Sequence, residues 1–243
     1  MSGHSKWANI KRKKGAADAA RAKIFTRIGK EIQIAVRDGG PNPDNNSKLK
    51  DVIAKAKANN MPNDNIQRSI KKASGEGGGD NIEEIRYEGY GPGGVAIMVD
   101  VVTDNRNRTA SEVRHVFDKH GGNLGNNGCV AFMFDRKGVI LIENDGDIDE
   151  ETLMMDVLEA GAEDFNPTEE VFEITTDPAS FSAVSEALEG KGYVLAEAEI
   201  KMVPQTTTHL EDEKQIEQIG KLLDGLDDND DVIDVFHSWD EEE

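Results

Sequence analysis

The sequence predicts an α+β fold, with a small basic three-helix segment at the amino end followed by alternating strands and helices. Three observations predict it. Apolar residues recur at helical spacing through the first 73 residues, GVAIMVDVV and GVILIE have the composition of buried strands, and helical patterns lie between such strands. With 243 residues, of which 37% are hydrophobic, the chain is long enough for two or three domains and can bury a core.

The first segment is predicted to form three short helices. The breaker-rich stretch DGGPNPDNN separates the first from the second, and the third, around Asn63 to Ala73, stops at Gly75. The inward-facing residues expected from the spacing are Ile24, Phe25, Ile28, Ile32, Ala35, Val36, Leu49, Val52, Ile53, Ala56, Ile66 and Ile70. GEGGGD follows and has little side chain to bury, so a domain boundary is expected there.

The next part alternates between strand and helix patterns. TASEVRHVFDKHGG is predicted to be a helix, and CVAFMF a strand with Cys129 buried in it. GVILIE, a helix at Glu150 to Ala160, VFEITT, a helix begun by Asp177 and Pro178, and AEAEIKM then follow one another. The residues expected to share one face of AEAEIKM are Ala196, Ala198, Ile200 and Met202. This order of elements indicates a ferredoxin-like sandwich.

The tail contains one predicted helix and one predicted strand. Thr208 and Glu211 stand in capping-box spacing before the helical stripe of QIEQIGKLLDGL, and VIDVF has the pattern of a strand. Two elements are too few for an independent domain, so we expect the tail to pack on another part of the chain. DDNDD, between them, is interpreted as a solvated turn.

Charge is distributed unevenly along the chain. The formal net charge is −20, yet residues 1–72 hold 17 Lys+Arg and 6 Asp+Glu, whereas the remainder holds 11 and 42. Such asymmetry indicates an interaction surface and favours a polyanion as the partner of the basic segment. The candidate nucleic-acid contacts are Lys6, Trp7, Lys11, Arg12, Lys13, Lys14, Arg21, Lys23, Arg27 and Lys30. Trp7 could stack on a base or pack against Ile10.

A second candidate contact precedes the predicted helix of TASEVRHVFDKHGG. Arg106 and Arg108 stand just before this helix, whose N-terminal backbone amides can also receive a phosphate.

Catalytic and metal-binding patterns do not emerge from the sequence. His115 and His120 are five residues apart and do not share a helix face, and the acidic runs lack the glycine that a calcium loop needs. YEGYGPGGVA precedes a strand, which is the wrong order for a dinucleotide fingerprint, so a tight turn is expected. We therefore expect no enzyme, no metal, no cofactor and no small-molecule substrate.

The location expected from the sequence is the cytoplasm. One cysteine cannot form a disulfide within the chain, and no apolar run approaches the ~18 residues of a membrane span. No membrane partner is expected.

Three long stretches resemble the YebC family, which includes the mitochondrial translational activator of cytochrome oxidase subunit I. They are GHSKWANIKRKKGAADAARAKIFTRIGKEI, GGPNPDNNSKLKDVIAKAKANNMPNDNIQRSIKKASGE and YEGYGPGGVAIMVDVVTDNRNRTASEVRHVFDKHGGNLG. The resemblance implies three domains, with a discontinuous middle domain to which the tail returns. The expected divisions are a helical domain at 1–78, a middle domain at 79–134 plus 205–243, and an inserted ferredoxin-like domain at 135–204.

The resemblance also implies regulation of gene expression. Bacterial members are generally named probable DNA-binding transcriptional regulators, whereas organellar and some bacterial members point to translation at the ribosome. The sequence shows no helix-turn-helix, zinc finger, basic zipper or RNP-type strand that would decide between DNA and ribosomal or messenger RNA. A third alternative is an acidic protein-interaction scaffold.

Overall fold

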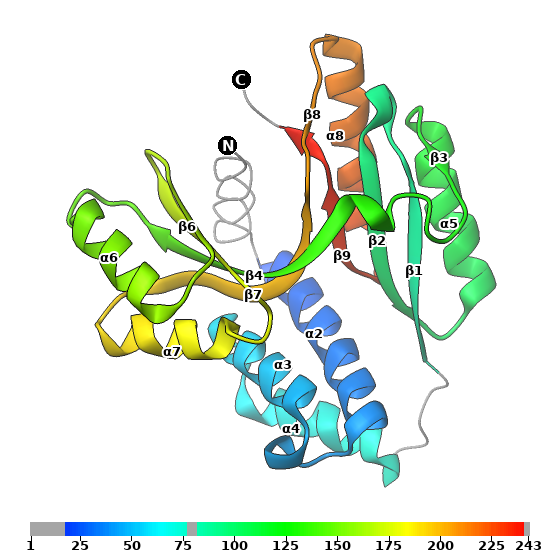
Figure 1. Cartoon of the computed structure of the whole chain (residues 1–243). Coiled ribbons are helices and arrows are strands. Elements are labelled where there is room, and N and C mark those ends of the chain that lie inside the picture. Colours follow the sequence, from blue (N-terminus) through cyan, green and yellow to red (C-terminus); the bar gives the residue numbers. More distant parts are fainter. Residues whose placement is uncertain (1–17, 77–81, 241–243) are drawn as a thin grey trace. The chain divides into compact units, whose positions relative to one another are not determined.

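The computed structural model describes residues 18–76 and 82–240, with side chains from residue 22 onward in the first range (Figure 1). The predicted α+β fold class is confirmed, with helices first and sheets after them. The chain divides into two compact units. One holds the described residues up to Phe132 together with Leu210–Ser238, and the other holds Met133–His209 with Trp239 and Asp240.

Three helices open the first unit, as the sequence predicts. They enclose a core of the expected aliphatic residues, and Asn46 joins the first two helices. Its side-chain oxygen accepts from the Leu49 amide, and its Nδ2 donates to the carbonyl of Ala35 at 2.7 Å. A Cβ on Gly39 would lie 2.7 Å from this side chain, so glycine is needed there. The helices are α2 (Asp18–Gly39), α3 (Ser47–Ala58) and α4 (Asn63–Lys71), with short turns η1 (Pro43–Asn45) and η2 (Lys72–Glu76).

A four-stranded sheet with the order β3-β1-β2-β9 completes this unit. Its last strand comes from the tail and pairs antiparallel with β2, so the tail supplies an edge of a sheet begun far earlier in the chain. Ile34 of α2 packs with Val102 and Ile233 of the sheet. The elements are β1 (Glu83–Tyr90), β2 (Ala96–Thr103), α5 (Arg106–Lys119), β3 (Asn123–Leu124), α8 (Glu213–Asp227) and β9 (Val232–His237).

The second unit has the predicted ferredoxin-like topology. Its antiparallel sheet has the order β5-β6-β4-β7, and the two helices pack on one face over residues such as Ile140, Phe172 and Ile174. No helix in the described part of the chain is long and apolar enough to cross a membrane. The elements are β4 (Phe134–Glu143), α6 (Glu150–Ala160), β5 (Asp164–Pro167), β6 (Val171–Thr176), α7 (Phe181–Gly190) and β7 (Leu195–Pro204), beside the small pair β8 (Thr208–His209) and β10 (Trp239–Asp240).

Two predictions about strands are wrong. CVAFMF is not a strand, because its residues form a turn and the short helix η4 (Ala131–Met133), and β4 begins at Phe134. Cys129 is half-buried rather than buried. On β7 a register shift opposite Leu141 and Ile142 puts Ala196 against the other face of the sheet, where it packs with Val139 and Leu141.

Two predicted helix starts are also wrong. The helix α7 begins at Phe181, because Asp177 accepts from the Ala179 amide and forms a turn before the helix. The tail helix α8 is capped by Asp212, whose carboxylate accepts from the amides of Lys214 and Gln215. At α8 a polar residue nearer the helix thus replaces the predicted cap, whereas Ser180 before α7 makes no side-chain cap hydrogen bond.

Candidate nucleic-acid interface

The charged face of α2 meets the acidic turn at the end of α8. Arg27 Nη1 lies 2.8 Å from Asp227 Oδ1, and the same guanidinium donates to the Asp227 carbonyl. Lys23 Nζ lies 3.2 Å from Asp228 Oδ1. The interpretation of DDNDD as a solvated turn is confirmed for Asp227, Asp228 and Asp230, which are exposed, but not for Asp231, which is buried. The sequence did not predict that Asp227 and Asp228 also pair with cations about 200 residues earlier in the chain.

Asp231 is the centre of a buried polar network. Its carboxylate accepts from Lys30 Nζ at 2.8 Å and Arg108 Nη2 at 2.6 Å, and from the hydroxyls of Thr103 and Thr109 at 3.1 and 2.7 Å. Burial by itself would raise the pKa of Asp231, but the hydrogen bonds from Lys30, Arg108 and Thr109 outweigh it and hold the pKa well below its ordinary value. This network joins α2, α5 and the tail.

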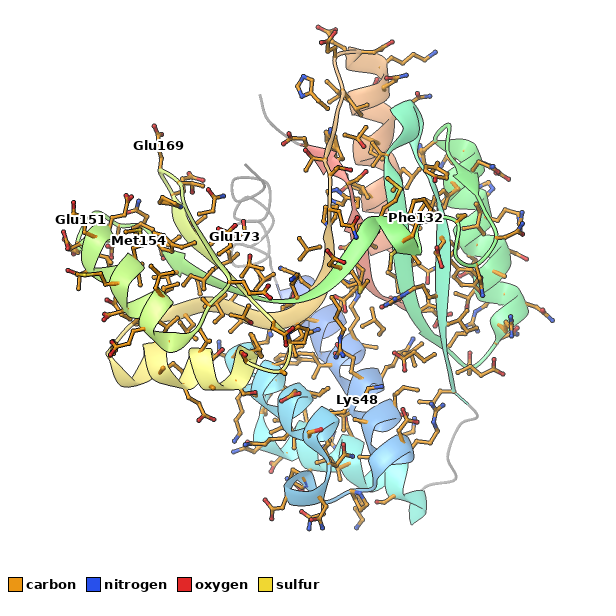
Figure 2. The ribbon with its side chains drawn as sticks, in the orientation of Figure 1. Lys48, Phe132, Glu151, Met154, Glu169 and Glu173 are labelled. Atoms are coloured by element: carbon orange, nitrogen blue, oxygen red, sulfur yellow. The ribbon has the colours of Figure 1, made fainter. Side chains whose placement is uncertain are left out.

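Other cations of the helical segment also have acidic partners. Lys48 lies 3.2 Å from Glu84 of β1, and Figure 2 marks its position at the helical segment. Lys55 lies 3.2 Å from Glu31 and 3.9 Å from Asp234 of β9. Much of the positive charge that the sequence concentrates here is thus neutralised within the first unit.

Three cations on the outer sides of α3 and α4 are arranged differently. Lys50, Lys57 and Arg68 are exposed and have no acidic group within ion-pair distance in the part of the chain that the structure describes. Lys50 and Lys57 are seven residues apart, which puts them on the same side of α3 about two turns apart. Lys50 and Lys57 lie on the side of α3 away from the buried Leu49, Val52 and Ala56. This helical spacing is the sequence signal by which their exposure could have been predicted.

The start of α5 separates the two predicted arginines. Arg108 is bound to Asp231 and Asp104, whereas Arg106 is exposed and has no ion pair among the described residues. The side chain of Asn105 caps the helix by accepting from the Arg108 amide. The amide and the guanidinium of Arg108 therefore already have partners within the protein.

The remaining predicted contacts lie at the amino end. Arg21 is in α2, but its side chain is outside the described residues. The opening segment, residues 1–17, lies wholly outside the described residues. Its candidate contacts are Lys6, Trp7, Lys11, Arg12, Lys13 and Lys14. The structure brings Lys23, Arg27 and Lys30 together along one acidic turn.

Glu88, in the glycine-rich stretch YEGYGPGG, holds the loop that follows β3. Its carboxylate accepts from the amides of Gly128, Val130 and Ala131 at 2.8 to 3.0 Å. Burial would raise the pKa of Glu88, but these three backbone hydrogen bonds lower it further than burial raises it. The expected tight turn is present at Gly91 to Val95, after β1. No group of three acidic, His or Cys side chains among the described residues could hold a metal ion.

Comparisons with known proteins agree over the full length of the chain. Residues 5–76 match the TACO1/YebC protein N-terminal domain, and residues 82–239 match the TACO1/YebC second and third domain. A probable transcriptional regulatory protein of Ruminiclostridium cellulolyticum is 66% identical over 100% of this chain and 98% of its own length. Another, from Acetivibrio thermocellus, is 64% identical over 98% and 99%.

A solved structure has the same fold. The crystal structure of a conserved hypothetical protein from Aquifex aeolicus superposes with a TM-score of 0.83 at 48% identity, over 92% of this chain and 91% of that one. Both family domains and the similar fold lead to one conclusion: the chain belongs to the TACO1/YebC family.

Proposed function

We propose that this protein is a DNA-binding transcriptional regulator that contacts the phosphate backbone through its basic helical segment. The proposal rests on three exposed cations on the outer sides of α3 and α4. Lys50, Lys57 and Arg68 form no ion pair with the described residues of the protein. The relatives' names, which are those of probable transcriptional regulatory proteins, support the regulatory role.

The ion pairs divide the cations into two groups. Lys23, Arg27 and Lys30 face carboxylates of the tail, so a phosphate would have to displace an existing partner to reach them. Lys50 and Lys57 face solvent and can approach a phosphate without that cost. We therefore propose that α3 and α4 contribute contacts in addition to those of the opening segment, Lys11 to Lys14.

Salt dependence of binding tests this proposal. Lys50→Ala with Lys57→Ala removes up to two released counterions, so the slope of log affinity against log salt on duplex DNA should become shallower by about 0.9 per lost contact. Arg136→Ala with Lys214→Ala removes the same charge from exposed positions outside the helical segment and is the matched control.

Three outcomes are distinguishable in this experiment. Equal slopes for both double variants would contradict the role of α3. A shallower slope for the α3 variant on duplex DNA alone supports the proposal. If the change occurs on a structured RNA and not on duplex DNA, the contact belongs to a translation factor, and the DNA-binding assignment is wrong.

A further inference from the structure

The helix α6 has apolar side chains on two sides. Leu153 and Val157 are buried against the sheet of the second unit. Met154, Met155 and Leu158, however, are 42%, 61% and 58% exposed. Packing within the unit accounts for the first pair and not for these three.

The three exposed residues form one patch. At about 100° per residue, positions 154, 155 and 158 lie within one side of the helix, and Glu151 precedes Met154 and Leu158 on the same side. Figure 2 shows Glu151 and Met154 together on α6. Contiguous exposed apolar side chains of this kind mark interaction sites, and methionine adapts its shape to varied partners.

Acidic groups surround this patch. Glu150 and Glu151 stand in the first turn of α6, and Glu159 follows Leu158. The favourable interaction of carboxylates with a helix amino end accounts for the first two. That interaction does not explain why Met154, Met155 and Leu158, which lie beside these carboxylates, are exposed to water.

The charge of the whole unit narrows the partner class. Residues 133–209 contain 19 Asp+Glu and 4 Lys+Arg. Three of the four cations are already paired, Lys137 with Glu163, Lys191 with Asp156 and Glu159, and Lys201 with Glu197 and Glu199. Such a surface repels nucleic acids and anionic lipids and attracts cations.

We infer that the face of α6 formed by Met154, Met155 and Leu158 binds a basic amphipathic protein segment. Such a segment presents apolar side chains at helical spacing flanked by Lys or Arg, which matches an apolar patch with an acidic border.

The test uses the full chain labelled with [¹³C-methyl]methionine and two synthetic amphipathic probes. One probe is a helical Lys/Leu peptide, and the other has each Leu replaced by Ser at the same charge. We expect the Lys/Leu peptide to shift the Met154 and Met155 methyl signals and to bind at least about tenfold more tightly than the Lys/Ser peptide.

Three variants decide the outcome. Met155→Ser with Leu158→Ser should weaken binding of the Lys/Leu peptide about tenfold or more, whereas Phe132→Ser, at a residue that is 70% exposed in the other unit, should not. Glu151→Lys should weaken it in a salt-dependent way while leaving the apolar patch intact. Equal affinities of the wild-type and double-variant chains would overturn the inference. So would sedimentation showing that the face joins two copies of this chain.

Discussion

Asp231 and Lys201 have opposite roles in the two units. In the first unit, the carboxylate of Asp231 forms ion pairs with the two cations Lys30 and Arg108. In the second unit, the ammonium group of Lys201 forms ion pairs with the two carboxylates of Glu197 and Glu199. Burial by itself would lower the pKa of Lys201, but the surrounding glutamates outweigh it and raise the pKa above its ordinary value.

The difference lies in where the partners come from. The partners of Asp231 belong to α2 and α5, which are 201 and 123 residues away in the chain. The ion-pair partners of Lys201 lie on its own strand, two and four residues earlier, and Glu173 of β6 adds a further charge interaction. The same chemistry therefore connects elements more than 100 residues apart in the first unit and balances charge within one small sheet in the second. The predictions below test this contrast.

The largest effect is expected from Asp231→Asn. It leaves the shape of the side chain but removes the negative charge that Lys30 and Arg108 share, and breaking a buried ion pair costs about 3–5 kcal/mol. We expect the lower part of that range, because Arg108 is partly exposed and keeps its second ion pair, with Asp104. Denaturant unfolding of the full chain measures the loss.

The pH dependence checks the same residue. The pKa of Asp231 is lowered on folding, so its contribution to stability is present above the unfolded value of about 3.8 and is lost as the pH falls toward the folded value. The wild-type chain should lose stability more steeply than Asp231→Asn below about pH 4. If the stability of the two chains falls equally steeply below that pH, the charge of Asp231 does not have the stabilising role proposed for it.

A smaller effect is expected from Lys201→Met. The substitution keeps the length of the side chain but takes away the cation beside Glu197 and Glu199, which costs about 1–3 kcal/mol for a group left without that contact. Both glutamates retain some exposure to water, so the loss should be smaller than for Asp231→Asn. A loss as large as that of Asp231→Asn would mean that Lys201, too, connects distant parts of the unit.

The smallest effect is expected from Lys191→Ala. Lys191 lies 2.7 Å from Asp156 and 2.6 Å from Glu159, but these contacts are at the surface, where ion pairs contribute little to stability. The hydroxyl of Tyr193 still donates to Asp156 in the variant. We expect little or no change in the midpoint of thermal unfolding. A clear decrease would show that surface ion pairs of the second unit contribute to its stability, which would contradict the contrast between the two units.

Local patterns were sufficient to locate the helices, although not the starts of α7 and α8. The periodic spacing of apolar residues predicted α6 with the bounds that the structure shows, Glu150–Ala160, because helical hydrogen bonds and packing faces repeat every few residues. β5 was missed because Asp164–Pro167 is four residues long and contains a proline. CVAFMF has a strand-like composition, but Glu88, some forty residues earlier, accepts from its backbone amides and keeps it in a loop.

The sequence by itself determined the fold class, the family resemblance and the concentration of positive charge in residues 1–72. Only the tertiary structure decided which charges are available. Lys30 and Lys50 both belong to the basic segment of residues 1–72, yet one is bound to Asp231 and the other is exposed to water. The physical reason is that an ion pair depends on distance in space, which spacing along the chain does not reveal.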